Sequence, residues 1–194
     1  MFIAHPDRAV QWAADSAPPA ADHPDPFWRS LYFFNVYRLV VAGLLLTVVA
    51  IWRDSLQLGS QNLTLFVVTA VFYVVFSVLC FTLIKIRWRF NLQLTVQIAA
   101  DIGFIVTLMH ASSGISSGLG LLLLASLAGA ALISRGRLAL FYAALASIAV
   151  LLEHTYGVLN YDANVAQYVQ AGLLSVGYFA TAWLAHTLAK YAAA

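Results

Sequence analysis

The chain has 194 residues, of which 62% are hydrophobic and only 9% charged, and its formal net charge is +2. A soluble globular domain carries about 45–50% apolar and about 25% charged residues, so this chain cannot cover itself with polar surface. The composition predicts an integral membrane protein and excludes a largely disordered chain and a nucleic-acid-binding domain.

Residues 1–28 differ from everything that follows. All five prolines and four of the eight acidic residues lie in this segment, which has no hydrophobic period. Such a composition predicts a disordered tail on the cytoplasmic side. The segment lacks the basic stretch and apolar core that are typical of a signal peptide, so we expect the first apolar run to remain as a membrane anchor.

Six apolar runs follow, each close to the roughly 20 residues that a helix needs to cross a bilayer. They are 31–52, 62–84, 92–110, 117–134, 137–158 and 166–189. Short connectors with turn-forming residues join them, which indicates antiparallel neighbours. The predicted fold is all-α, a six-helix up-and-down transmembrane bundle over residues 29–190. Residues 191–194 are expected to be a scar or the start of a cytoplasmic output region that is cut short.

The basic residues indicate how the bundle is oriented. Arg29 and Arg38 are expected to flank the start of the first run, and nine of the ten basic residues then fall on one side, with Arg53 alone on the other. Basic residues stay on the cytoplasmic side of a membrane. We therefore expect both termini in the cytoplasm and a multi-pass protein of the bacterial inner membrane.

The third run carries a polar stripe. Gln93, Gln97 and Asp101 are spaced four residues apart, which places them on one helix face. Asp101 falls near midspan, where an ionised carboxylate in hydrocarbon is costly, so the stripe should face protein or water, or Asp101 should be protonated. Three roles stay open: hydrogen bonds that fix helix packing, contact with a signal or partner, and a proton or ion site.

More polar and small residues lie toward the outer face. His110 ends the third run and precedes a Ser/Gly segment, for which a partner-docking turn and a tight re-entry turn both stay open. Glu153 and His154 lie near the outer end of the fifth run. The candidate sensing or partner contacts are Gln93, Gln97, Asp101, His110, Ser113, Gly114, Ser117, Gly118, Glu153 and His154. Candidates for helix packing or dimerisation in the sixth run are Gly172, Gly177, Thr181 and Ala185.

We expect no catalytic, cofactor or metal site. The single cysteine, Cys80, excludes an intramolecular disulfide and a cysteine-rich metal site. Ser117 and His186 have the residue types of a six-helix intramembrane serine protease. They should lie near opposite membrane faces, roughly 20–30 Å apart in depth, whereas a nucleophile and its base must meet within about 3 Å.

Several short runs carry a resemblance to a known family. They are FFNVYRL at 33–39, FNLQLT at 90–95, ADI at 100–102, MHASSG at 109–114, SGLG at 117–120 and RGRLA at 135–139. Together they resemble the membrane region of PilS-type bacterial sensor histidine kinases. The similarity follows the same order over about residues 30–190.

The resemblance implies a signal-input module of a two-component system. In that family the six helices are thought to read the pilin subunit stored in the inner membrane, and the last helix passes the signal to a PAS domain and a kinase core. The core phosphorylates a response regulator that controls pilin transcription. Because this chain holds no phosphoacceptor helix or ATP lid, the fragment is not expected to be an enzyme, and ATP and Mg²⁺ are implied only for the missing core.

The resemblance implies four partners: pilin in the membrane, a response regulator reached through the kinase core, a second copy of the chain, and the bilayer. The expected mechanism is a two-state bundle, dimeric through the first or last span, whose balance a partner helix shifts. Asp101, Gln97 and the Ser/Gly turn are the best candidate contacts, and Asp101→Asn is expected to keep the shape while removing the charge. Two other functions stay open: a stand-alone small transporter or channel with Asp101, Glu153 and His154 along a polar path, and a pilus-assembly scaffold.

Overall fold

The computed structural model describes residues 25–52, 58–87, 89–134, 137–161 and 163–192. All regular structure in these ranges is helical. The helices are α2 (Asp25–Ile51), α3 (Leu63–Ile86), α4 (Phe90–Ala111), the short 3₁₀ helix η1 (Gly114–Ser117), α5 (Gly120–Ile133), α6 (Arg137–Tyr161) and α7 (Gln167–Ala192). The all-α prediction is confirmed for this part of the chain.

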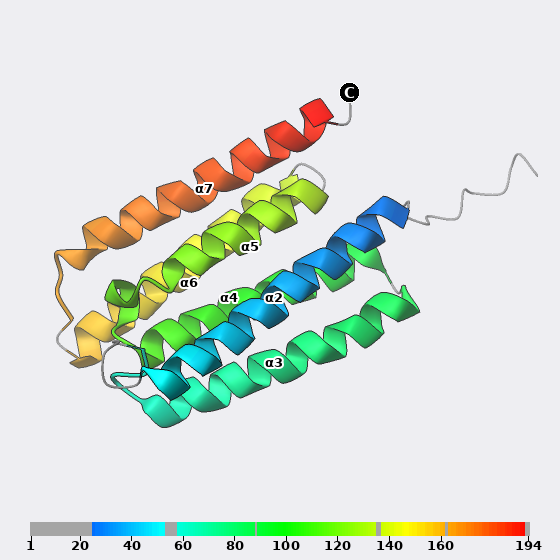
Figure 1. The fold of residues 1–194 in the computed structure, drawn as a ribbon. Helices are drawn as coiled ribbons and strands as arrows, with labels where there is room; N and C mark the ends of the chain where they lie inside the picture. Colours follow the sequence, from blue (N-terminus) through cyan, green and yellow to red (C-terminus); the bar gives the residue numbers. More distant parts are fainter. Residues whose placement is uncertain (1–24, 53–57, 88, 135–136, 162, 193–194) are drawn as a thin grey trace, which may run out of the picture.

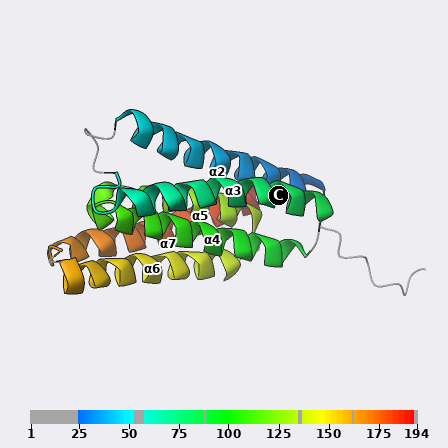
Figure 2. The same cartoon turned by 90° about the horizontal axis from the view of Figure 1, so that it is seen from below.

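Successive helices run in opposite directions and form a bundle (Figure 1). Helix α4 packs against α3, α5 and α6, while α2 packs against α3 and α5, and α7 against α5 and α6. In the view from below, α2 and α6 lie at opposite edges (Figure 2). Helix α4 therefore connects two groups, α2–α3 on one side and α5–α7 on the other.

The six predicted helices are present, but they differ in their fit to a bilayer. Four are long and apolar enough to cross one: α2 from Phe27, α3, α4 and α6. Helix α5 has 14 residues, about 21 Å of rise, which is shorter than a full span. The run expected at 117–134 is divided, because Gly118 adopts a left-handed conformation (φ 74°) that ends η1 before α5 begins.

The expected boundaries shift at the first helix. Helix α2 begins at Asp25, inside the segment 1–28 that was predicted as a tail. Pro26 fits its first turn, where a backbone N–H has no partner within the helix. Residues 1–24 lie outside the described residues, as do the last two of residues 191–194 and the connector residues 53–57 and 135–136.

Helix α2 starts and α7 ends at the same end of the bundle, where the α3–α4 and α5–α6 connections also lie (Figure 1). Most of the described basic residues gather at this end and are exposed. They are Arg29, Lys85, Arg87, Arg89, Arg137 and Lys190. The charges thus cluster at one end, as the sequence predicted.

Arg38 does not belong to this group, and its assignment to the flank of the first span is wrong. It lies in the middle of α2, thirteen residues after Asp25, which is about 20 Å along the helix axis. Its side chain is 1% exposed. A guanidinium at that depth needs a counter-charge, because a lone buried charge is very costly.

Helices α2 and α5 approach closely at a glycine. A Cβ atom at Gly129 would lie 2.7 Å from Cδ2 and 2.8 Å from Cε2 of the Phe34 ring. The Phe34 ring is itself buried, so it cannot move away without disturbing the core. The contact thus requires a residue without a side chain at position 129.

We expect Gly129→Ala to lower the free energy of unfolding by about 1–3 kcal/mol, the usual cost of overpacking a core. Gly103→Ala is the matched control, because a Cβ there meets no atom within 4 Å. It should be neutral or stabilising by up to about 1 kcal/mol. Unfolding of the purified protein in mixed micelles measures both, and equal effects would contradict the close approach of α2 and α5.

Candidate functional site

A buried ion pair joins α2 to α4. Nε of Arg38 lies 2.6 Å from Oδ1 of Asp101, and Nη2 of Arg38 donates to Oδ2 at 2.9 Å. Both side chains are 1% exposed. The Nη2 contact is a charge-assisted hydrogen bond, and the Nε contact adds a second close approach of opposite charges.

Polar groups from three helices surround this pair. The Tyr73 hydroxyl of α3 donates to Oδ1 of Asp101 at 2.9 Å. Nη1 of Arg38 donates to Oδ1 of Asn35 at 3.2 Å and to Oε1 of Gln97 at 3.3 Å. We call these five residues the charge clamp: Asn35 and Arg38 on α2, Tyr73 on α3, and Gln97 and Asp101 on α4.

Two further sets of contacts hold the clamp in place. Nδ2 of Asn35 donates to the backbone carbonyl of Ser77 at 2.9 Å, which ties α2 to α3. The Arg38 guanidinium lies 5.2 Å from the centre of the Phe34 ring and 5.8 Å from that of Phe76, within range of cation–π attraction. The guanidinium is therefore enclosed by hydrogen-bond acceptors and aromatic rings.

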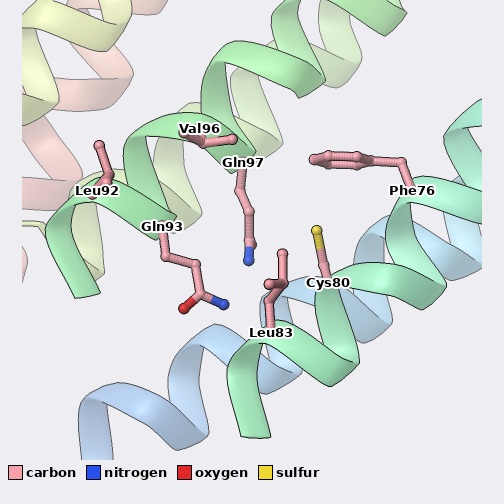
Figure 3. A pocket seen from close by; sticks show the side chains of 7 residues that line it. All are labelled: Phe76, Cys80, Leu83, Leu92, Gln93, Val96 and Gln97. Atoms are coloured by element: carbon pink, nitrogen blue, oxygen red, sulfur yellow. The ribbon is translucent and has the colours of Figure 1, made fainter. Parts of the chain in front are cut away.

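The predicted stripe on α4 divides between two surroundings. Asp101 faces protein, paired with a cation, and Gln97 accepts from the same guanidinium. Gln93 lies outside the clamp and lines a cavity of about 160 Å³ between α3 and α4, together with one face of Gln97 (Figure 3). We call this space the amide cavity; its lining residues are Phe76, Cys80, Leu83, Leu92, Gln93, Val96 and Gln97.

A second polar cluster lies at the other end of α4. Nδ1 of His110 lies 3.4 Å from Oε1 of Glu153 on α6. Gly114 approaches the same carboxylate so closely that a Cβ atom there would lie 3.5 Å from Oε1. The rings of Tyr156 and Tyr161 lie 5.5 and 5.7 Å from the imidazole. The structure therefore brings together His110, Gly114 and Glu153.

His154 does not join this cluster. Its buried ring packs edge-on against Tyr168 of α7, with centroids 4.5 Å apart. Adjacent helical residues point about 100° apart, so Glu153 and His154 serve different contacts. Among the described residues, no three His, Cys, Asp or Glu side chains gather as a metal site would require.

The Ser/Gly segment forms a compact turn bonded to the α2–α3 connection. The hydroxyl of Ser113 lies 2.8 Å from that of Ser60. Ser117 donates to the backbone carbonyl of Gly114 at 2.7 Å. Gly114 and Gly118 both have positive φ, 63° and 74°, a conformation that suits glycine. The segment is a compact turn, and both roles predicted for it stay open.

The small residues predicted on α7 have unequal surroundings. A Cβ atom at Gly177 would lie 3.6 Å from Cδ2 of Leu124 on α5, whereas one at Gly172 would meet nothing within 4 Å. Ala185 is buried and Thr181 half-buried. Gly177 thus lies at the α5–α7 contact, and Gly172 faces open space.

Three members of the clamp were missed by sequence reasoning: Asn35, Arg38 and Tyr73. A signal was present, because Arg38 is embedded in an apolar run and Asp101 is embedded in another. Two opposite charges that are each too costly to bury alone suggest a pair. This pairing also changes the expectation for Asp101→Asn, which would leave a buried guanidinium without its counter-charge.

The fold and its buried charge clamp define a multi-pass helical membrane domain, and comparison with known proteins specifies which one. Residues 21–194 match the PilS-like transmembrane domain family. A curated relative, sensor protein kinase PilS of Pseudomonas aeruginosa, is 30% identical over 162 residues, covering 84% of this chain. The chain belongs to the PilS-like transmembrane domain family and is a multi-pass protein of the inner membrane.

The match concerns one part of that relative, because the aligned region spans 30% of the relative's length. No solved structure matches the chain. The geometry of the charge clamp therefore comes from this structure alone.

We expect Arg38→Met and Asp101→Leu each to lower the free energy of unfolding by about 3–5 kcal/mol, because each leaves the other charge buried and unpaired. The double variant should lose much less than the sum of the two. Unfolding by SDS titration measures this double-mutant cycle. Pairing Arg38→Met with Glu153→Gln, in the separate cluster, is the control and should give additive effects. Additive losses for Arg38 and Asp101 would contradict the ion pair.

Proposed function

We propose that this chain is the transmembrane signal-input module of a two-component sensor histidine kinase that controls pilin transcription. The observation that carries the proposal is the match of residues 21–194 to the PilS-like transmembrane domain. The curated relative is named a sensor protein kinase. In the whole protein, a cytoplasmic kinase core would bind ATP and Mg²⁺ and phosphorylate a response regulator, and the catalysis would reside in that core.

The arrangement of α7 supports a role in transmitting the signal. This helix packs against α5, α6 and η1, outside the helices that the charge clamp joins. Its other side exposes large apolar residues: Leu173, Val176, Trp183, Leu184 and Leu188. It ends at the basic end of the bundle (Figure 1), which we assign to the cytoplasm by the positive-inside rule. A shift of α7 would reach a following domain without breaking the clamp.

The signal in this proposal is a pilin helix in the same membrane. Apolar residues exposed on the bundle suit contact with another transmembrane helix or a second copy of the chain, and close packing supplies affinity in lipid. We assign the polar contact to the outer cluster of His110, Gly114 and Glu153, because Oε2 of Glu153 has no hydrogen-bond partner. The partner's binding to one of two α7 positions would shift their balance.

The arrangement of the polar groups does not favour the transport hypothesis. Asp101 is engaged by Arg38 and Tyr73, and Glu153 and His154 make separate contacts. A pilus-assembly scaffold would bind the same helix without changing transcription, so the transcript is the decisive measurement.

In the source bacterium, we expect Gly177→Ile to change the pilin transcript severalfold at unchanged protein level, because a side chain at the α5–α7 contact displaces α7. Gly172→Ile, where a Cβ atom meets no atom within 4 Å, is the control and should leave the transcript unchanged. Quantitative RT-PCR, with an immunoblot for the protein, makes the measurement. With the pilin promoter joined to a reporter gene, removing the pilin coding sequence should abolish the difference in reporter transcript.

An unchanged pilin transcript after deletion of the gene that encodes this protein would contradict the proposal. If that transcript is unchanged, capture of pilin by a photocrosslinker at exposed Leu173 of the intact protein would support the scaffold instead. Ion flux in proteoliposomes that is lost in Glu153→Gln would support the transporter.

A further inference from the structure

The amide cavity contains hydrogen-bonding groups that the described protein leaves unpaired. Nε2 of Gln97 and both polar atoms of Gln93 are buried and have no hydrogen-bond partner. Figure 3 shows both side chains extending into the space between α3 and α4, toward Cys80 and Leu83. Buried polar groups are normally paired, so these atoms point to an occupant.

The orientation of the Gln97 amide follows from its neighbour. A guanidinium can only donate hydrogen bonds, so the oxygen of Gln97 must face Arg38, and the structure has this contact at 3.3 Å. The NH₂ group is thereby turned toward the cavity. Gln97 is 1% exposed, which leaves its two N–H donors no bulk water.

The walls and mouth of the cavity define the rest of the occupant. Apart from the two amides and the Cys80 sulfur, its lining is hydrocarbon. Leu83, Leu92 and Val96 line it and are also exposed on the bundle surface, so the cavity opens where lipid surrounds the protein. A dry cavity of about 150 Å³ accepts one benzene ring, and this cavity has about 160 Å³.

We propose that the amide cavity binds an uncharged, membrane-dissolved carbonyl compound. Its carbonyl oxygen accepts from the NH₂ groups of Gln97 and Gln93, and its apolar body lies against Phe76, Leu83 and Val96. The occupant is uncharged because Asp101 already neutralises Arg38 and the entrance is from lipid. A quinone ring and the ester group of an acyl lipid share this chemistry.

The depth of the cavity suits both sources. Gln93 and Gln97 lie three and seven residues after Phe90, the first residue of α4, which is about 5 and 10 Å along the helix. Both amides thus lie toward the end of the bundle where the basic residues gather, which we assign to the membrane surface by the positive-inside rule. Gln97 also belongs to the charge clamp. An occupant bound to its NH₂ group would therefore contact the same amide whose oxygen accepts from Arg38.

The test uses the complete 194-residue chain in nanodiscs, with ¹⁵N-labelled glutamine side chains observed by NMR. The probes are methyl decanoate, an acyl ester, and decylubiquinone, a quinone. Undecane and decylbenzene are the matched compounds without a carbonyl. We expect at least one carbonyl probe to shift the Gln93 and Gln97 amide signals in a saturable way, and neither hydrocarbon to do so.

Gln93→Met keeps an unbranched side chain and removes one donor, so it should weaken binding about three- to tenfold. Gln170→Met, exposed on α7, is the control and should leave binding unchanged. Val96→Phe narrows the mouth without removing a polar group and should also weaken binding. Slower alkylation of Cys80, the single thiol of the chain, reports occupation independently.

Each outcome supports or overturns the proposal that the amide cavity binds a carbonyl compound. A shift with methyl decanoate alone identifies an acyl lipid, a shift with decylubiquinone alone identifies a quinone, and shifts with both support the shared chemistry. Equal shifts with the hydrocarbons, or none with any compound, would overturn the proposal. Shifts produced only by an added transmembrane peptide would also overturn it, because the cavity would then receive a helix side chain. None of these results depends on whether the chain senses pilin.

Discussion

A guanidinium and a carboxylate that meet halfway along their helices determine how the first half of this bundle is assembled. Either charge alone would be prohibitively costly among hydrocarbon groups, so α2 and α4 must align at one register, where Arg38 and Asp101 face each other. The remaining acceptors and donors then fix the third helix, through Tyr73 and the backbone of Ser77. A buried pair adds little net stability compared with apolar side chains, and here its main effect is to specify one arrangement.

The second half of the bundle, α5–α7, is held by close packing of helices rather than by an ion pair. Helix α5 meets its neighbours at glycines, with Gly129 against Phe34 of α2 and Gly120 against Tyr178 of α7, whose hydroxyl donates to the Gly120 carbonyl. Close packing is less directional than a hydrogen-bonded ion pair, and packed helices can slide by small shear motions. The described bundle thus combines an ion-paired register in α2–α4 with glycine-mediated close packing of α5 against α2 and α7.

The sequence was sufficient for features that depend on single segments. Hydropathy located six helices, and the four-residue spacing placed Gln93, Gln97 and Asp101 on one face of the third. The positions of the basic residues indicated that they gather at one end of the bundle. It failed where the outcome depends on which helices touch. Arg38 was assigned to the interface because an arginine near a predicted span end is usually found there, and only its side-chain contact with Asp101 across α2 and α4 shows its partner. The His110–Glu153 contact likewise requires α4 and α6 to be neighbours, which hydropathy does not reveal.

Gln97 links the clamp to the surface of the bundle. Its oxygen is used by Arg38, and its nitrogen faces the amide cavity, so the two ends of one planar group belong to different surroundings. Rotating the amide would place NH₂ against a guanidinium, two donors facing each other, which neither group can satisfy. The amide is therefore locked in one orientation by the ion pair. A ligand in the proposed site would therefore meet a donor whose orientation the Arg38 contact fixes.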